Sequence, residues 1–336
     1  MSTKEQILGI LEKQHGSDIS GQQIALQLGL SRNAVWKAIQ ALQKDGYHIS
    51  AATNRGYRLS GKNDILSKQG IASFLTDKSL TKNLKIYRTL PSTNLTAREL
   101  AHAGAPGGTV VIADEQTVGR GRMGRDFFSP AGSGVYMSIL LRPDMSIQNG
   151  LLITTAAAVA VCRAIEGLFD VAPRIKWVND ILIGGKKVCG ILTEGAAGFE
   201  SGSIDHIILG IGINFSTALH TFPDEIKTIA ASLSHSQSPV VRNALIAAVL
   251  DQLFALLPGL ESREFIGDYK SRSAVLGKQI EIVRGGETTP CTAVDITRDG
   301  GLVVRYADGR QETLTSGEIS VRGDFYCDRQ KRDEST

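Results

Sequence analysis

The first sixty residues carry apolar positions at the spacing of three short helices. One apolar stripe covers residues 7–11, and a second helical stretch covers residues 22–28 and ends at Gly29. A third helix is predicted behind Ser31, an N-cap residue, because apolar residues recur there at i, i+4 and i+7. Two helices joined by a short glycine-containing turn are typical of a helix-turn-helix motif.

A β-hairpin is predicted directly after these helices. Residues 47–49 and 57–59 are short β-type runs, and Asn54, Arg55 and Gly56 between them supply turn residues and a basic tip. The whole segment therefore has the pattern of a winged helix-turn-helix.

Basic charge is concentrated in this segment. Residues 1–62 hold eight Lys/Arg against four Asp/Glu, a net charge of +4, whereas the remainder carries −1. This favours DNA as the partner, and a small protein-interaction domain is the alternative. We expect Trp36 to pack in the domain core. The predicted DNA-binding residues begin the third helix or lie in the hairpin: Ser31, Arg32, Asn33, Lys37 and Arg55.

From about Asp64 the pattern changes to apolar strands separated by glycine-rich loops. Several runs alternate in period two, as half-buried strands do. Gly150 to Leu168 and Val241 to Leu256 have helical periodicity instead, so the segment is predicted to form an α+β domain. The predicted strands are Thr109–Ala113, Val135–Leu141, Ile175–Val178, Val188–Leu192 and Ile207–Ile213.

The last part of the chain breaks into short β-rich runs. They cover residues 279–283, 291–296, 301–305 and 310–314, and glycine-containing turns separate them. This spacing predicts a small antiparallel barrel. The tail from Asp328 to Thr336 is charged and has no apolar residue, so we expect it to be disordered.

Neither export nor membrane insertion is predicted. We find no apolar run of the roughly 18 to 20 residues that span a bilayer. The cysteines stand far apart without a Cys-x-x-Cys spacing, which argues against a zinc site and a disulfide scaffold and favours a reducing cytoplasm. They are Cys162, Cys189, Cys291 and Cys327.

The most unusual string in the chain is GRGRMGR, residues 119–125. Glycine lets the backbone approach a ligand closely, and arginine supplies permanently charged donors for phosphate and carboxylate. Such a loop can hold two mutually repelling anions side by side, as joining a carboxylate to ATP requires. Taken alone, the motif also fits a basic loop that binds nucleic acid.

A second polar string, KWVND at residues 176–180, follows a predicted strand, and Gly184-Gly185-Lys186-Lys187 turns into the next one. A lysine that leads a strand can direct its ammonium group at a transferring phosphoryl group. We favour Lys187 over Lys186 for this role, and a solvated hairpin turn is the alternative. Asp180 can hold Mg²⁺ or orient an incoming amine.

Together with two further motifs, these strings resemble the biotin–protein ligase family, in its group that carries a DNA-binding domain and acts as biotin repressor. The further motifs are Ser92-Thr93-Asn94 and the strand end GIGINF at residues 210–215. The four motifs occur in the family's order, and the match covers essentially the whole chain. The sequence departs from the family pattern at Met123, Phe127 and Val178, where arginine, tryptophan and proline are usual.

The resemblance implies a biotin–[biotin carboxyl carrier protein] ligase. Biotin and ATP would form biotinyl-5′-AMP and pyrophosphate with Mg²⁺ present, and a lysine of a carrier protein of the acetyl-CoA or pyruvate carboxylase type would then accept the biotin. The resemblance also implies a biotin-responsive repressor. Its corepressor would be biotinyl-5′-AMP, its partner operator DNA, and its form with adenylate bound a homodimer.

The resemblance also implies the roles of individual residues. The neutral urea of biotin needs paired donors and acceptors, and the implied biotin-binding residues are Ser92, Thr93, Asn94, Gln116, Gly119, Arg120, Gly121, Arg122, Lys187 and Gly190. The implied ATP- or adenylate-binding residues are Arg120, Arg122, Arg125, Phe127, Lys176, Asn179, Lys187 and Asn214. The implied catalytic residues are Lys187, Arg122 and Asp180, and Asp180 is also the candidate Mg²⁺ ligand.

The expected architecture is a multidomain α+β chain. Residues 1–62 would form the winged helix-turn-helix, 63–272 a mixed-sheet, class II synthetase-like ligase domain, 273–327 an SH3-like β-barrel, and 328–336 a tail.

Two other functions compete with biotin ligation. A lipoate ligase performs the same acyl-adenylate chemistry, although the glycine-arginine loop favours biotin. A sensing module that binds the adenylate without transferring it would retain the pocket, but the presence of Lys187, Asn179 and Asp180 together argues against it.

Overall fold

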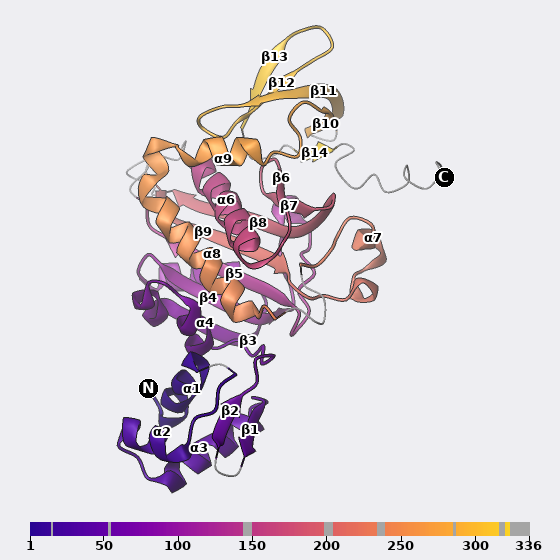
Figure 1. Ribbon diagram of the computed structural model, residues 1–336. Helices are drawn as coiled ribbons and strands as arrows, with labels where there is room; N and C mark the ends of the chain where they lie inside the picture. The colour runs from indigo at the N-terminus through magenta and orange to yellow at the C-terminus, as the bar shows by residue number, and fades with distance from the viewer. Residues whose placement is uncertain are drawn as a thin grey trace, which may run out of the picture. The chain divides into compact units, whose positions relative to one another are not determined.

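The computed structural model describes residues 1–14, 16–52, 55–143, 150–197, 204–233, 239–284, 287–315 and 320–322. Predictions for Asn54, Gly285, Gly286, Cys327 and the tail 328–336 lie outside these residues. The chain divides into two compact units (Figure 1). The first unit comprises Met1–Lys82 with Gln237–Ala248, and the second comprises Asn83–Ser236 with Val249–Thr336.

Three helices open the first unit: α1 (Thr3–Lys13), α2 (Gly21–Leu28) and α3 (Arg32–Lys44). Each begins after a serine whose hydroxyl oxygen accepts a hydrogen bond from the backbone N–H three residues on. Gly29 ends α2 in the left-handed conformation, with φ 64°. The predicted helix-turn-helix is therefore confirmed.

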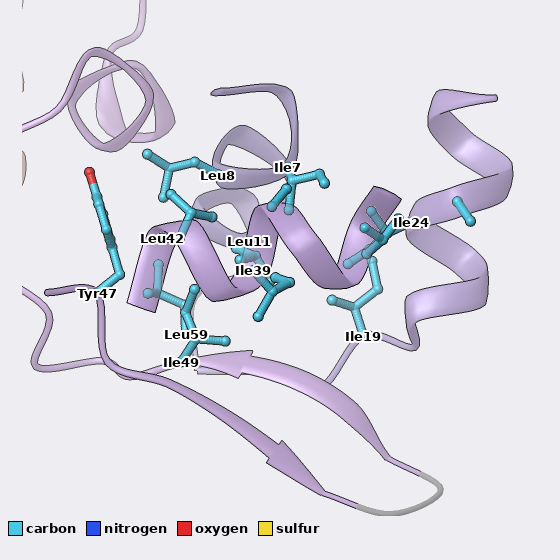
Figure 2. Close-up of a cluster of buried hydrophobic side chains, with 13 residues drawn as sticks. Ile7, Leu8, Leu11, Ile19, Ile24, Ile39, Leu42, Tyr47, Ile49 and Leu59 are labelled. Atoms are coloured by element: carbon cyan, nitrogen blue, oxygen red, sulfur yellow. The ribbon is translucent and has the colours of Figure 1, made fainter. Parts of the chain in front are cut away.

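The helices and the hairpin share one buried core (Figure 2), built from the positions whose periodicity predicted it. Burying these side chains stabilises the unit by about 25 cal/mol per Å² of apolar surface. The residues labelled in the close-up are Ile7, Leu8, Leu11, Ile19, Ile24, Ile39, Leu42, Tyr47, Ile49 and Leu59.

The hairpin consists of β1 (Ile49–Ala52) and β2 (Gly56–Leu59), which pair antiparallel. The first strand thus begins two residues later than predicted. Tyr57 N–H donates to the carbonyl of Ile19 at 2.8 Å. Gly56 has φ 92°, and a Cβ there would lie 2.2 Å from the Ile19 carbonyl oxygen, so only glycine allows this close approach.

The first unit continues past the hairpin. It includes helix α4 (Lys68–Phe74), which was not predicted, and the start of helix α8 (Arg242–Leu256), which matches the helix predicted over Val241 to Leu256. The Arg242 guanidinium Nε lies 2.7 Å from Asp64 Oδ2, and the Asn243 amide donates to the Ile65 carbonyl at 2.9 Å. These contacts join segments about 180 residues apart in the sequence.

Among the described residues of the second unit, seven strands form one mixed sheet in the order β3-β4-β5-β9-β8-β7-β6. Only the β3–β4 pairing is parallel. Each predicted strand has a counterpart, but the one predicted over Ile175–Val178 ends at Lys176, and residues 177–178 form a turn. Strands β3 and β7 were not predicted. The strand bounds are β3 Leu84–Leu90, β4 Thr109–Gln116, β5 Gly134–Leu141, β6 Arg174–Lys176, β7 Asp180–Ile183, β8 Lys186–Ala197 and β9 Ile204–Asn214.

Helices α5 (Thr93–His102) and α6 (Gly150–Leu168) cover opposite faces of this sheet. Asn94 on α5 donates a hydrogen bond to Glu194 of β8, whereas Thr154 on α6 is hydrogen-bonded to Thr193. Successive residues of a strand point to opposite faces, so the two helices lie on opposite sides. The remaining helical segments are α7 (Asp224–Lys227), α9 (Phe265–Ser271) and the 3-10 turns η1 (Lys78–Asn83), η2 (Arg122–Gly124), η4 (Leu219–Thr221) and η5 (Leu257–Ser262).

Within the described ranges, two helical segments have the length and mean hydropathy of a membrane span, Leu151–Leu168 and Arg242–Ser262. Charged residues interrupt both segments, among them Arg163 and Glu166 in the first and Asp251 in the second, so neither is a continuous apolar run of the kind that would predict a membrane span. In Leu151–Leu168, 72% of the segment is buried within the structure, as expected for a core helix. Its apolar surface is explained by packing against the sheet.

The C-terminal segment forms an antiparallel sheet whose order, within the described part of the chain, is β13-β12-β11-β10-β14. This order is open, with β13 and β14 as its edges, so the closed barrel predicted from the strand spacing is not seen there. The strands are β10 Gln279–Arg284, β11 Glu287–Ile296, β12 Leu302–Arg305, β13 Gln311–Leu314 and β14 Ser320–Arg322. The Trp177 indole N–H donates to the Gly300 carbonyl at 2.9 Å and ties this segment to the KWVND string.

Candidate active site

A cavity of ≈ 240 Å³ opens over the α5 face of the large sheet, on a floor of glycines. Gly190 of β8 pairs with Gly212 of β9. A Cβ at Gly212 would lie 2.6 Å from the Phe127 ring, and one at Gly190 would lie 3.1 Å from the Lys187 side chain. The floor glycines therefore make room for the aromatic ring and for the end of the lysine.

The glycine-arginine string forms one wall of the cavity and folds back on itself. Gly121 N–H donates to the Arg125 carbonyl at 2.7 Å, and Phe127 N–H donates to the Gly119 carbonyl at 2.9 Å. Met123 has φ 57°, a conformation that glycine adopts more readily than methionine. This turn places three arginine side chains around one opening.

Arg122 is the most enclosed of these arginines and reaches the KWVND string. Its guanidinium donates to the Asn179 amide oxygen at 3.1 Å. Burial lowers the pKa of Arg122 from its usual value, and the nearby carboxylate of Asp180 opposes that shift. The guanidinium therefore stays a cation in a partly desolvated place, where an anionic ligand would gain most from it.

Lys187 stands at the start of β8, and its ammonium group lies 2.7 Å from Asp180 Oδ1. Lys187 N–H also donates to the Ile229 carbonyl at 2.7 Å, which fixes the backbone at this point. The pair lies at the same end of the cavity as Arg122 and Asn179. This end of the cavity thus combines two cations, a carboxylate and an amide.

The other end of the cavity is lined by neutral hydrogen-bonding groups. Thr93 N–H donates to Gln116 Oε1 at 2.8 Å, and Gln116 Nε2 donates to Ser129 Oγ at 2.9 Å. Beneath Thr93, the hydroxyl of Ser138 is buried within 2.7 Å of Thr93 Oγ1. Donors and acceptors here suit an uncharged polar group rather than an anion.

The structure brings together nearly all of the biotin- and adenylate-site residues predicted from the sequence. The residues that line the cavity are Ser92, Thr93, Asn94, Gln116, Arg120, Gly121, Arg122, Arg125, Phe127, Lys176, Asn179, Asp180, Lys187, Gly190 and Asn214. Gly119 does not line it but lies directly behind, since a Cβ there would be 2.3 Å from the Phe127 carbonyl oxygen.

Sequence reasoning missed several groups at this site. Ser129, Ser138 and Glu194 support the lining residues, and Phe222 and Ile226 line the cavity from a segment given no role. Ser138 carried one available signal, because it is a polar residue inside an otherwise apolar strand.

The predicted DNA-binding residues lie on the first unit. Arg32, Asn33 and Lys37 are exposed on α3, and Arg55 is exposed at the end of the hairpin turn. The hydroxyl of Ser31 caps α3 by accepting the Ala34 N–H at 3.1 Å. Ser31 therefore has a structural role in addition to the predicted one.

The exposure of Trp36 differs from the prediction. It was predicted to pack in the core, but 51% of it is exposed. Val35, Ala38, Ile39 and Leu42 fill the buried face of α3, and Trp36 lies about 100° around the helix from Val35. Asn33, Trp36, Lys37 and Gln40 are all exposed and follow the i, i+3, i+4, i+7 spacing of one helix face.

Comparison with known proteins agrees with these geometries. The chain is 46% identical over 244 residues to the bifunctional ligase/repressor BirA of Bacillus subtilis. The aligned segment covers 72% of this chain and 74% of that protein. Residues 86–214 match the biotin/lipoate A/B protein ligase family. The chain belongs to this family.

The chain also matches two further domain models. Residues 3–58 match an HTH domain, and residues 275–322 match the biotin protein ligase C terminal domain. The bifunctional ligase/repressor BirA of Escherichia coli is 26% identical over 92% of this chain and 94% of that protein. A biotin protein ligase of Aquifex aeolicus, solved with biotin and ATP, has a TM-score of 0.61 at 30% identity, over 72% of this chain and 99% of that one.

Proposed function

We propose that this protein is an ATP-dependent biotin–protein ligase that also represses transcription in response to biotin. It forms biotinyl-5′-AMP and transfers the biotin to a lysine of a biotin carboxyl carrier protein of the acetyl-CoA or pyruvate carboxylase type. These tasks are divided among the domain ranges 1–62, 63–272 and 273–327, and the last assists the engagement of ATP and the carrier protein.

The observation that carries the proposal is the two-ended cavity. Its neutral end, with Thr93 and Gln116, offers donors and acceptors for the urea of biotin. Its charged end, with Arg122, Asn179 and Lys187, suits a carboxylate and a phosphate together. A ligand with an uncharged cyclic urea at one end and a carboxylate at the other matches both.

In the first step a carboxylate oxygen of biotin attacks the α-phosphorus of ATP. The bond between that phosphorus and the bridging oxygen breaks, and pyrophosphate leaves. Lys187 and Arg122 reduce the repulsion between the two anions and stabilise the charge that builds up, the kind of contact worth several kcal/mol in other enzymes. Arg120 and Arg125 contribute further positive charge, whereas Phe127, Lys176 and Asn214 bind the adenylate.

In the second step the amine of a carrier lysine attacks the acyl carbon of biotinyl-5′-AMP. An amide bond forms, the acyl–phosphate bond breaks, and AMP leaves with the electron pair while the amine loses a proton. Asp180 orients the incoming amine by accepting a hydrogen bond. Its position 2.7 Å from Lys187 places that acceptor beside the charged end of the cavity.

Asp180 is also the candidate protein ligand for Mg²⁺. The described residues contain no group of three or more His, Cys, Asp or Glu side chains able to hold a metal. A lone carboxylate still fits a Mg²⁺ that arrives on the ATP phosphates, because such ions keep most of their water and use one or two protein carboxylates. When bound, the ion would neutralise phosphate charge, and Asp180 would be its protein ligand.

The repressor function rests on the exposed face of α3. Arg32, Asn33 and Lys37 would enter the major groove of an operator, and Arg55 would contact the adjacent backbone. Binding to a two-fold operator calls for a homodimer, which biotinyl-5′-AMP would promote by binding one conformation of the arginine loop. A cytoplasmic location fits this function and the buried, unpaired thiols of Cys162, Cys189 and Cys291.

The test is to incubate the purified protein with ATP, Mg²⁺ and a carrier domain, and to supply radiolabelled biotin or lipoate in parallel. We expect labelled carrier with biotin only. Labelling with lipoate alone would identify a lipoate ligase, and adenylate formation without transfer would identify a sensing module.

A further inference from the structure

A row of buried polar groups connects the cavity to a charged pair behind it. Asn94 follows Thr93 at the start of α5, and its amide nitrogen donates to Glu194 Oε2 at 2.6 Å. Arg98, one turn further along α5, donates to the other oxygen of the same carboxylate at 2.8 Å. Thr93, Asn94 and Ser138 are each at least nine-tenths buried.

The backbone of the sheet is shaped to hold this row. Ser138 of β5 pairs directly with Gly210 of β9. A Cβ at Gly210 would lie 2.2 Å from Asn94 Oδ1, so the amide lies flat against the glycine. Any other residue at position 210 would displace the amide from the contacts that it makes.

The chemistry of these groups fixes the direction of every hydrogen bond in the row. A carboxylate only accepts, so the amide nitrogen of Asn94 must face Glu194 and its oxygen must face Ser138. That amide oxygen also only accepts, and Ser138 Oγ lies 2.6 Å from it. The single hydroxyl proton of Ser138 is therefore committed to Asn94.

Thr93 is affected in turn. Thr93 Oγ1 lies 2.7 Å from Ser138 Oγ. The Ser138 proton cannot serve both this contact and the one with Asn94, whose oxygen has no proton to give. The proton between Ser138 and Thr93 must therefore come from the Thr93 hydroxyl, which then turns away from Gln116 Oε1. Gln116 Oε1, at a longer 3.1 Å from Thr93 Oγ1, keeps its hydrogen bond from the backbone N–H of Thr93. The lone pairs of Thr93 Oγ1 are then available to the cavity, which Thr93 lines.

We propose that Glu194, held by Arg98, is a positioning residue that makes Thr93 Oγ1 an acceptor for an N–H of the substrate's urea. Glu194 does not touch the substrate. It acts through Asn94 and Ser138 and sets which way the hydroxyl of Thr93 points. This inference rests on the proposed biotin ligase activity.

Glu194→Gln tests the inference because a glutamine side chain can donate, which allows the Asn94 amide to turn over and the row to reverse. We expect the KM for biotin to rise about tenfold, the value of roughly one hydrogen bond, while the KM for ATP and kcat change little. Glu166→Gln is the matched control, since Glu166 also pairs with an arginine, Arg272, whereas Glu194 is the one that holds Asn94.

A double-mutant cycle separates this role from a general structural one. Thr93→Val removes the acceptor, so adding Glu194→Gln to it should cause no further rise in the biotin KM. Additive effects, or equal rises in both KM values, would overturn the inference. Thermal unfolding of each variant identifies any that fail to fold. If Glu194→Gln fails, Ser138→Ala replaces it, because this variant breaks the row without altering charge. It must then raise the KM for biotin without raising the KM for ATP.

Failure of the inference and failure of the proposed function give different results. If the wild-type protein makes no biotinyl-5′-AMP, the proposed function is wrong. If the wild-type protein is active and the Glu194→Gln variant has the same KM for biotin as wild type, only the positioning role is wrong.

Discussion

Lys187 Nζ and Asp180 Oδ1 are 2.7 Å apart across neighbouring strands β8 and β7. An ammonium group held by a carboxylate keeps a fixed position before any substrate arrives, so little reorganisation is needed when an anion binds. In the proposed mechanism the pair would connect the two steps, because Lys187 would face the carboxylate and phosphate and Asp180 would accept a hydrogen bond from the amine.

Lys187→Ala should slow adenylate formation by about 10²–10³-fold, the usual cost of losing one charged contact at a reacting centre. The measurement is pyrophosphate release with biotin and ATP in a rapid-mixing assay. Lys186→Ala, one residue away in the same strand and outside the cavity lining, is the control and should remain near wild type. If the two variants lose activity equally, the role does not belong to Lys187.

Asp180→Asn should slow the second step, transfer of biotin to the carrier lysine. Its effect on that step should exceed the effect of Lys187→Ala on the same step. An amide keeps an acceptor oxygen but loses the charge that orients a protonated or neutral amine, so transfer to the carrier should slow by about tenfold or more. Single-turnover transfer from preformed biotinyl-5′-AMP to a carrier domain isolates this step. Normal transfer with slow adenylate formation would move the role of Asp180 to the first step.

Gly212→Ala should damage the adenylate site by steric conflict. The new methyl group would lie 2.6 Å from Cε1 of Phe127, so the ring must move from the glycine floor. We expect weaker ATP binding, measured by calorimetry, with only a small change in thermal stability. Gly195→Ala is the control on neighbouring strand β8, because a Cβ there meets nothing within 4 Å.

Sequence patterns predicted much of this architecture because periodicity records burial. The stripe in α1 and the apolar run of α6 appear in the structure at the predicted places. Four short motifs also contain about half of the residues that line the cavity, since glycine and arginine are constrained by ligand chemistry rather than by packing alone.

Other features depend on pairings that no local pattern records. Glu194 meets Asn94 across 100 residues of sequence, and Arg242 meets Asp64 across 178. Strand order and these long-range contacts depend on residues that come together only in the folded chain, so a pattern in neighbouring residues does not predict them. The error on Trp36 has a different cause, because it assigned the indole by residue type instead of by its angle around the helix.

Trp36→Ala should weaken operator binding while leaving ligase activity unchanged. The exposed indole shares a helix face with Asn33 and Lys37, and an apolar side chain there can contact thymine methyl groups in the major groove. A loss of about tenfold is expected by fluorescence anisotropy with operator DNA, biotin and ATP. Phe74→Ala, which removes another exposed aromatic of the same unit from α4, should bind DNA normally.

Glu12 makes the stability of the first unit depend on pH. Its side chain is 4% exposed, Oε1 has no hydrogen-bond partner, and burial raises the pKa of this carboxyl from 4.5 to about 7. The folded state therefore holds a proton that the unfolded state has lost between pH 4.5 and about 7, so stability falls as the pH rises through that range. The full effect is on the order of 3 kcal/mol.

Replacing this carboxyl with a neutral amide should remove the penalty. We expect Glu12→Gln to raise the free energy of unfolding at pH 8 and to have little effect at pH 5, measured by urea denaturation of the full chain. Glu5→Gln on the same helix is the matched control with the opposite sign. The backbone hydrogen bond with Ser2 lowers the pKa of Glu5. A glutamine would still accept that N–H, as Gln23 does for Ser20, but it would lose the negative charge at the helix N-terminus, so the protein should be slightly less stable at pH 8. If Glu12→Gln unfolds at the same urea concentration as wild type at both pH values, the buried carboxyl is not the source of the pH dependence.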